Sequence, residues 1–205
     1  MKFNGFNGQA HRHAIFAELL SKCRFDAIIE TGACNGETSG YMAEVSGLPV
    51  LTCEIDPKWH AEAVERTKGF GVLVENDDSR EMLKTLAASA FLIRRPCFYL
   101  DAHWGEELPL AEEVETILSN WRSYVIMIDD FQVPGDAGYG FDDYGGEKKI
   151  RRELIVASLD KHGPGVFFPK EPSSTETGAR RGSCFLASPW EMTDLLGTCA
   201  GLTRV

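Results

Sequence analysis

The stretch Phe25–Thr38, which reads Phe-Asp-Ala-Ile-Ile-Glu-Thr-Gly-Ala-Cys-Asn-Gly-Glu-Thr, constrains the fold more than any other part of the chain. Residues 27–29 are a short apolar run, typical of a strand that is buried on both faces of a parallel sheet. Gly32 and Gly36 then bracket a tight turn, and Thr38 can cap the helix that we expect next. A strand, a glycine turn and a helix start in this order predict a ligand site at the end of the strand.

The spacing of the glycines argues against two common nucleotide sites. Gly-x-x-x-Gly fails the Gly-x-Gly-x-x-Gly pattern of dinucleotide sites, because Cys34 stands where a pyrophosphate would need bare backbone. No lysine follows in the Walker arrangement, which argues against a nucleoside triphosphate. We therefore predict a cofactor without phosphates. An ordinary strand-to-helix turn is the alternative, since two glycines in a loop are common.

This motif resembles the opening of the class I S-adenosylmethionine-dependent methyltransferases, and the resemblance extends to about Tyr144. The family carries an acidic residue at the end of the first strand and then a Gly-x-x-x-Gly turn, as in Glu30, Gly32 and Gly36 here. The resemblance implies that Glu30 holds the methionine ammonium of the cofactor, directly or through water. It also implies an α/β fold: a doubly wound, Rossmann-like, mostly parallel sheet of seven strands, antiparallel at its last strand, with helices on both faces.

Composition limits the classes of protein that this chain can belong to. Its 205 residues, 43% hydrophobic and 25% charged, predict a single domain over residues 1–205. A formal charge of -10 disfavours nucleic acid as a partner. The longest apolar run, Leu86–Ile93, is far shorter than the roughly 20 residues of a membrane span, so we expect no membrane partner. The N-terminus lacks a signal-peptide profile and the six cysteines are scattered, which favours a cytoplasmic location with reduced thiols and no zinc cluster.

Helical and extended patterns alternate along the chain, which predicts a parallel sheet covered on both faces. A leading helix is expected within residues 1–22, with an amphipathic pattern over residues 10–22. We expect its apolar face to pack on the sheet or on the partner subunit of a homodimer. That face consists of Ile15, Phe16, Leu19 and Leu20. His11 and His13 in the same helix are expected to be solvated.

Glu54 ends the second predicted strand, Pro49–Glu54. An acidic group at this place can accept both hydrogen bonds of a ribose diol, and the resemblance assigns Glu54 to the ribose of the cofactor. A merely solvated strand end is the alternative. Asp56 is expected to cap the helix that Pro57 opens.

A third strand is predicted near residues 72–74, and the run Asn76-Asp77-Asp78-Ser79 then opens a helix. The family places an aspartate followed by a small residue here to bind the adenine amino group, which points to Asp78 and Ser79. Capping of the helix explains Asp78 almost equally well.

Three carboxylates and an imidazole follow the fourth and fifth predicted strands. Strand 97–100 delivers Asp101-Ala102-His103-Trp104, and strand 124–128 delivers Asp129-Asp130-Phe131. Because adjacent parallel strands end on the same edge of a sheet, these side chains would meet beside the cofactor. Burying so much negative charge is costly unless a cation or hydrogen bonds compensate it. We predict a hard divalent cation with oxygen ligands, Mg²⁺ for preference.

The same residues resemble the macrocin-type and novobiocin-type sugar O-methyltransferases, which have Asp-x-Asp after the fourth strand and Asp-Asp after the fifth. The resemblance implies that Asp101, Asp129 and Asp130 bind the metal, with Asp101 also facing cofactor and acceptor. His103 departs from the family's acidic base, so it is a candidate general base, a metal ligand or a structural residue. A metal-free site, in which Asp101 faces the substrate and the Asp pair caps a turn, is the alternative.

Residues 131–146 form a long loop rich in glycine and aromatic residues, directly after the Asp pair. We predict a substrate lid, because loops of this length in compact domains are often lids or binding loops. Aromatic and acidic side chains suit a polyhydroxylated or sugar-bearing acceptor, and Asp142 or Asp143 could instead reach the metal. The sequence therefore predicts methyl transfer to a hydroxyl of a small molecule. A non-catalytic cofactor-binding module and a metal-independent methyltransferase are the alternatives.

Three expectations concern the rest of the chain. The glutamates of a predicted helix at Pro109–Trp121 are expected to be solvated surface. A helix near residues 148–159 and an antiparallel strand pair at 166–168 and 183–187 are expected to complete the sheet. Arg180 and Arg181 are expected to be an exposed loop pair, and contact with an acidic group of the substrate is the alternative. The sequence of residues 189–205 gives no prediction.

Overall fold

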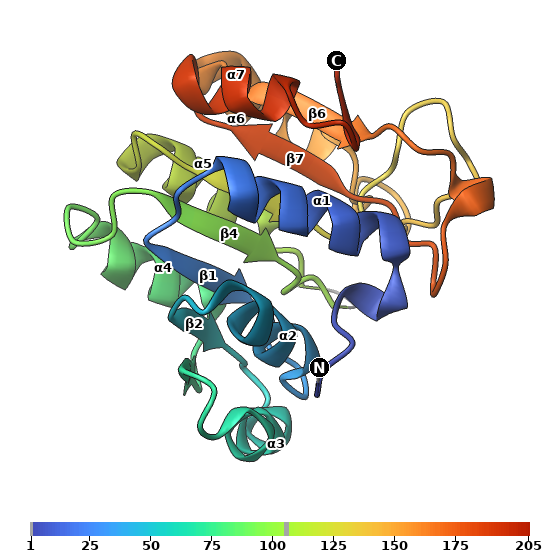
Figure 1. Cartoon of the computed structure of the whole chain (residues 1–205). Helices are drawn as coiled ribbons and strands as arrows, with labels where there is room; N and C mark the ends of the chain where they lie inside the picture. The colour runs from blue at the N-terminus through green and yellow to red at the C-terminus, as the bar shows by residue number, and fades with distance from the viewer. Residues whose placement is uncertain (1, 105–106) are drawn as a thin grey trace.

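The computed structural model describes residues 2–104 and 107–205, and its centre is one eight-stranded sheet (Figure 1). The strand order is β3-β2-β1-β4-β5-β7-β6-β8. The strands are β1 Ala27–Thr31, β2 Val50–Cys53, β3 Val72–Glu75, β4 Pro96–Leu100, β5 Val125–Ile128, β6 Gly165–Pro169, β7 Cys184–Ala187 and β8 Leu202–Arg204. The α-helices are α1 Ala10–Lys22, α2 Glu37–Ser46, α3 Pro57–Thr67, α4 Ser79–Ala87, α5 Leu110–Asn120, α6 Arg152–His162 and α7 Glu191–Gly197.

The sheet is parallel from β3 through β5, and β7 runs antiparallel to both β5 and β6. This confirms the predicted α/β class, the parallel body of the sheet and the antiparallel pair near its end. The sheet has one strand more than the seven that we predicted. The addition is β8, which pairs antiparallel with β6 and comes from the segment 189–205 that gave no prediction.

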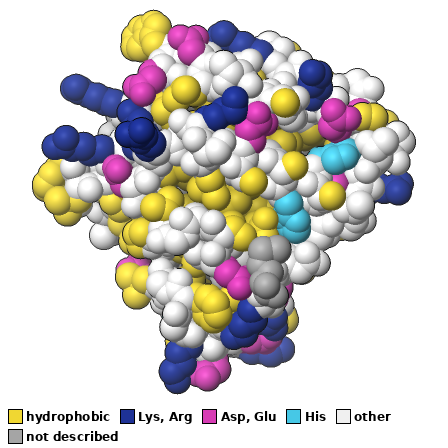
Figure 2. Space-filling view, in the orientation of Figure 1, with side chains coloured by type: hydrophobic (Ala, Val, Ile, Leu, Met, Phe, Trp, Pro, Cys, Tyr) yellow, Lys and Arg dark blue, Asp and Glu magenta, His cyan; other side chains and the backbone are white. Residues whose placement is uncertain are grey.

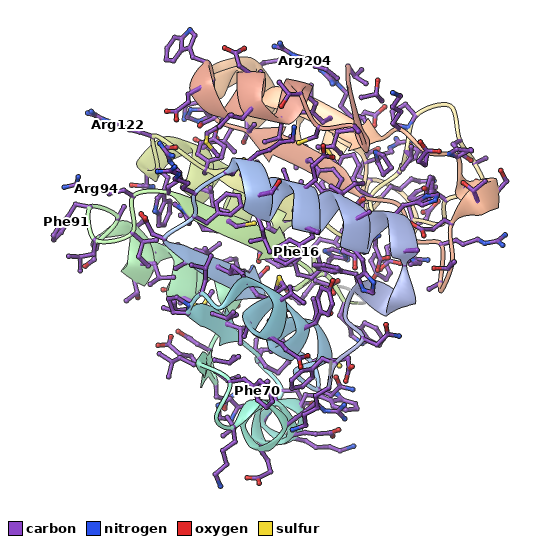
Figure 3. All side chains as sticks on the ribbon, in the orientation of Figure 1. Phe16, Phe70, Phe91, Arg94, Arg122 and Arg204 are labelled. Carbon is purple, nitrogen blue, oxygen red and sulfur yellow. The ribbon has the colours of Figure 1, made fainter. Side chains whose placement is uncertain are left out.

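Helices cover both faces of the sheet, because successive strand residues point to opposite sides. Ile28 contributes to the core beneath α1, α2 and α7, whereas its neighbour Ile29 contributes to the core beneath α4, α5 and α6. Figure 3 shows Phe16 reaching from α1 toward the sheet, where it is fully buried. All five residues of β1 are buried, as the apolar run predicted for a central parallel strand.

The leading helix occupies the predicted range and packs on the sheet. Its residues Ile15, Phe16 and Leu19 are at most 2% exposed. The expectation that both histidines are solvated was wrong, since each is partly buried. The ring of His13 stacks on that of Tyr41, with 4.6 Å between the ring centroids.

The glycine turn brings β1 close to the end of β4. A Cβ on Gly32 would lie 2.4 Å from the carbonyl oxygen of Asp101, and the φ of Gly32 is +82°, so no other residue fits without a shift. Gly36, with φ +78°, is the N-cap of α2. The expectation that Thr38 caps this helix was wrong: its hydroxyl accepts a hydrogen bond from the backbone N–H of Phe6 over 3.4 Å.

Helix α3 begins at the predicted capping residue, whereas α6 does not begin where we predicted. The Asp56 side chain accepts hydrogen bonds from the backbone N–H groups of Lys58 and Trp59, so it caps α3 as expected. Helix α6 begins later than predicted, at Arg152. The preceding residues are held in a turn, in which the backbone N–H of Tyr144 donates to the carbonyl of Lys148 over 2.8 Å.

Charge is distributed unevenly over the molecule. Arg94, Arg122 and the exposed ring of Phe91 project on one side of the molecule, at the amino-terminal ends of the strands (Figure 3), and Figure 2 shows basic side chains on that side. The opposite, carboxyl-terminal edge carries the acidic residues that follow the strands. No helix within the described ranges is long and apolar enough to cross a bilayer.

Candidate functional site

The carboxyl ends of β1, β2, β4 and β5 meet at one edge of the sheet, as their parallel pairing requires. Backbone hydrogen bonds extend the ladder past the strand ends. The N–H of Asp101 donates to the carbonyl of Thr31, and the N–H of Asp129 donates to that of Leu100, each over 3.0 Å. The acidic residues after β4 and β5 therefore start from neighbouring positions beside the glycine turn.

Glu54 lies next to the glycine turn at the end of β2. Its Oε2 accepts a hydrogen bond from the backbone N–H of Cys34 over 2.8 Å, and its Oε1 accepts one from Asp56 over 2.9 Å. Cys34 has φ +45°, an unusual conformation for a residue with a side chain. The carboxylate of Glu54 is half-buried, and a carboxylate has about four lone-pair sites, so it keeps acceptor capacity for a diol.

Glu30 lies inside the sheet and not at the surface of the turn. It is 1% exposed, and the hydroxyl of Ser39 donates a hydrogen bond to its carboxylate. Burial raises the pKa of Glu30 to about 7. Its carboxylate faces the protein interior, so its contact with a cofactor ammonium stays a prediction.

Asp78 and Ser79 stand at the start of α4. The Asp78 side chain accepts a hydrogen bond from the backbone N–H of Arg80 over 2.8 Å and pairs with the Arg80 guanidinium over 2.6 Å. The hydrogen bond from Arg80 holds the pKa of Asp78 below its usual value. The capping alternative is therefore realised, and the predicted role of these two residues in binding adenine stays a prediction.

Asp129 is enclosed in a network of hydrogen bonds. Arg12 and the backbone N–H of Asp130 donate to its Oδ1, and the Tyr99 hydroxyl donates to its Oδ2. Burial alone would raise the pKa of Asp129, but the charge of Arg12 and the Tyr99 hydrogen bond outweigh it and hold that pKa below its ordinary value. The carboxylate that we predicted as a metal ligand is thus already bound to a guanidinium.

Arg12 comes from α1 and is 2% exposed. Its Nη2 also donates to the carbonyl oxygens of Arg181 and Gly182, over 2.6 Å and 3.2 Å. Our sequence analysis missed this residue, although a signal was present. Arg12 precedes Ile15, Phe16 and Leu19 at helical spacings of three, four and seven, so it belongs to the buried face of α1.

A second guanidinium, that of Arg181, joins Asp130 to the loop at residues 131–146. Arg181 donates to Oδ1 of Asp130 and to Oδ1 of Asp142. The expectation of an exposed arginine pair holds for Arg180 and is wrong for Arg181, whose side chain is 26% exposed. Burial and the neighbouring Asp129 raise the pKa of Asp130 to about 6. Asp130 also has φ +52°, so its backbone is strained at the site.

His103 is buried between Asp101 and Asp130. Its Nε2 lies 3.7 Å from Oδ1 of Asp101 and 4.0 Å from Oδ2 of Asp130, and within the described ranges neither ring nitrogen has a hydrogen-bond partner. Burial lowers the pKa of His103, which favours the neutral ring. Burial together with the charges of Asp129 and Asp130 raises the pKa of Asp101.

One ligand atom from each of Asp101, His103 and Asp130 lies within 4.8 Å of the others, so this trio could hold a metal ion. The structure therefore brings together two of the three predicted ligands. The imidazole occupies the place beside them that we had predicted for Asp129, whose oxygens are engaged by Arg12 and Tyr99. The ligand role of Asp129 stays a prediction without support from this geometry.

The loop at residues 131–146 lies against this trio. The Tyr144 hydroxyl donates to the carbonyl oxygen of His103 over 3.2 Å. The backbone N–H of Asp142 donates to the carbonyl oxygen of Asp130 over 3.0 Å. Gly140 donates to the carbonyl oxygen of Arg180 over 2.9 Å. These contacts place the loop where a lid would lie, and its opening stays a prediction.

No protein-family model matches the sequence, and no curated protein matches it significantly. Solved structures do match. An O-methyltransferase from Bacillus cereus in complex with SAH has a TM-score of 0.57 at 16% identity over 86% of this chain and 80% of that chain. The N-methyltransferase NodS from Bradyrhizobium japonicum WM9 has a TM-score of 0.56 at 12% identity, over 88% and 94% of the two chains. Spermidine synthase from Thermotoga maritima has a TM-score of 0.58 at 10% identity, over 90% and 61%.

These identities establish the fold alone. The chain has the α/β fold of class I methyltransferases, as the glycine-turn motif predicted, and its structural neighbours include O- and N-methyltransferases. Spermidine synthase shares that fold, so the fold by itself does not fix the reaction. The sugar O-methyltransferase subtype stays a prediction.

Proposed function

We propose that this protein transfers a methyl group from S-adenosylmethionine to a hydroxyl of a small molecule, a sugar or glycosylated metabolite. The carboxylate of Glu54 beside the glycine turn carries the proposal. It is partly exposed and fixed by two backbone N–H groups, so it presents acceptors where a ribose diol of the cofactor would lie. The turn residues 32–36 contain no lysine or arginine, which fits a cofactor without phosphates.

The acceptor would lie between this cofactor site and the loop at residues 131–146. Displacement at a sulfonium methyl mainly needs the acceptor oxygen held in line with the methyl group, so positioning supplies most of the catalysis. Tyr144 and the acids of the loop are suited to binding a polyhydroxylated molecule. A formal charge of -10 argues against nucleic acid as the acceptor.

The cluster of Asp101, His103 and Asp130 supports two ways of removing the proton of the acceptor hydroxyl. A neutral His103 can accept it, since burial keeps the pKa of this ring low. Alternatively, Asp101, His103 and Asp130 hold a divalent ion, which when bound would supply a Lewis acid that lowers the pKa of a hydroxyl. A metal-independent methyltransferase is the second candidate, because Arg12 and Arg181 already offset part of the negative charge.

Adenosylhomocysteine is expected to bind the protein, and Glu54→Ala is expected to weaken that binding by about 1 to 3 kcal/mol, the cost of losing charge-assisted hydrogen bonds. Isothermal titration calorimetry measures both affinities. Glu65→Ala is the matched control, because Glu65 is 78% exposed and pairs with Lys68 at the C-terminal end of α3. Unchanged affinity in Glu54→Ala would remove Glu54 from the site, and binding of NAD but not adenosylhomocysteine would refute the proposed function.

A further inference from the structure

The imidazole of His103 is an unusual group to find without partners. The residue is 3% exposed, and both ring nitrogens lack hydrogen bonds within the described parts of the chain. A buried polar group without a partner costs about 1 to 3 kcal/mol, so such groups in native proteins require an explanation. The ring points into a cluster of carboxylates, which suggests that the missing partner is a cation.

The distances around Nε2 fit shared ligation better than hydrogen bonding. At 3.7 Å and 4.0 Å, the oxygens of Asp101 and Asp130 are too far from Nε2 for a hydrogen bond. Two ligands of one ion each lie about 2.0 to 2.2 Å from it, so their atoms can be up to about 4.4 Å apart. Both distances fall within that limit. Nε2 is therefore spaced from each of the two oxygens as a second ligand of one small divalent ion would be, and the three ligand atoms all lie within 4.8 Å of one another.

The arginines divide the acidic residues into two sets. Arg12 and Tyr99 engage both oxygens of Asp129. Arg181 engages Oδ1 of Asp130, which leaves Oδ2 of Asp130 facing His103. Asp129 is thereby held as a structural counter-ion, whereas Asp130 keeps one oxygen directed at His103.

The charge of the described side chains leaves room for a divalent cation. Four carboxylates, those of Asp101, Asp129, Asp130 and Asp142, face two guanidiniums, those of Arg12 and Arg181. With every group ionised, this cluster carries two uncompensated negative charges. Partly buried charges of one sign are costly unless a proton or a cation compensates them, and a single divalent ion would complete the pairing.

We infer that Asp101, His103 and Asp130 form a mixed imidazole and carboxylate site that binds Mn²⁺ or Co²⁺ in preference to Mg²⁺, and that Asp129 is not a ligand. The preference follows from the ligand chemistry. Mg²⁺ favours oxygen ligands, whereas first-row transition ions accept an imidazole nitrogen readily. The inference depends on the proposed function only for what the ion would do, because the site itself is defined by these three side chains.

Metal binding can be measured without cofactor or acceptor. Titration with Mn²⁺ followed by electron paramagnetic resonance gives the affinity, and competition with Mg²⁺ gives the preference. Pulsed measurements on the bound Mn²⁺ should show coupling to a nitrogen of His103. The variant His103→Gln offers an oxygen in place of that nitrogen, so it should lose the coupling and bind Mn²⁺ at least about 10-fold more weakly.

Two further variants and one parallel measurement make the test decisive. Asp101→Asn, at a partly exposed ligand, should also weaken Mn²⁺, and it serves if His103→Gln fails to fold by circular dichroism. Glu65→Gln should bind Mn²⁺ like the unaltered protein, because Glu65 is 78% exposed and pairs with Lys68 at the end of α3, away from this cluster. The inference would be overturned if the protein did not bind Mn²⁺, or if it bound Mg²⁺ as tightly as Mn²⁺. It would also be overturned if the bound Mn²⁺ showed no coupling to a nitrogen. Adenosylhomocysteine binding is measured separately, so that a failure of the metal-site inference can be told apart from a failure of the proposed function.

Discussion

Replacing Arg12 by alanine is expected to lower the free energy of unfolding by about 3 to 5 kcal/mol, the range for removing one partner of a buried ion pair. Arg12 and Asp129 are both buried, with side chains 2% and 1% exposed. Without the guanidinium, Asp129 would keep a negative charge, with the Tyr99 hydroxyl and one backbone N–H as its remaining hydrogen-bond donors among the described residues. Urea denaturation at neutral pH, followed by circular dichroism, measures the change.

Two comparisons identify the cause of that loss. Arg24→Ala, just after α1 at an exposed position, should change the free energy of unfolding by less than about 0.5 kcal/mol. The double variant Arg12→Ala with Asp129→Asn should recover part of the stability, because it removes the unpaired charge. If Arg12→Ala alone costs less than about 1 kcal/mol, the pair does not stabilise the fold in the way that we describe.

The fold could be predicted from the sequence because its determinants are local. The apolar run before Gly32 required a buried strand, and the Asp-Pro pair at 56–57 marked a helix start that the structure confirms. The edge that gathers the acidic residues followed from parallel strand order alone. Strand β8 escaped prediction, because three residues with one buried side chain carry too little periodicity to be recognised.

The chemistry of the site could be predicted only in part, because charge compensation is long-range. Asp129 and Arg12 are separated by 117 residues in sequence, and Asp130 and Arg181 by 51. From the sequence we saw three clustered carboxylates and inferred a metal to offset all of them. The structure places two guanidiniums among them, so an ion would have to offset only the remainder. The unpartnered state of His103 likewise depends on packing around its ring, which no local pattern reveals.

Glu113 shows the same limit on the other face of the sheet. We expected the glutamates of α5 to be solvated, and for Glu113 this was wrong, since it is 1% exposed. It lies on the helix face that also carries Leu110, Val114 and Ile117, all of them buried against the sheet. Burial raises the pKa of Glu113 to about 7, and the nearby hydroxyls of Ser79 and Thr31 offset this only in part.

This raised pKa should make the free energy of unfolding fall as the pH rises. Below about 4.5, the usual value, Glu113 is protonated in both the folded and the unfolded state and has no effect. Between about 4.5 and 7 the unfolded chain releases the proton while the folded protein keeps it, so folding becomes less favourable. Above about 7 the folded protein bears the full cost, about 3 kcal/mol at 1.36 kcal/mol per pH unit.

Glu113→Gln removes the ionisable group and keeps the shape of the side chain. We expect it to raise the free energy of unfolding by up to about 3 kcal/mol at pH 8 and to leave it nearly unchanged at pH 4.5, as measured by urea denaturation across that range. Glu112→Gln is the control, because the Glu112 side chain is 63% exposed on the same helix and should show no such dependence. A stabilisation by Glu113→Gln that is equal at both pH values would mean that the cost comes from packing and not from ionisation of the buried carboxyl.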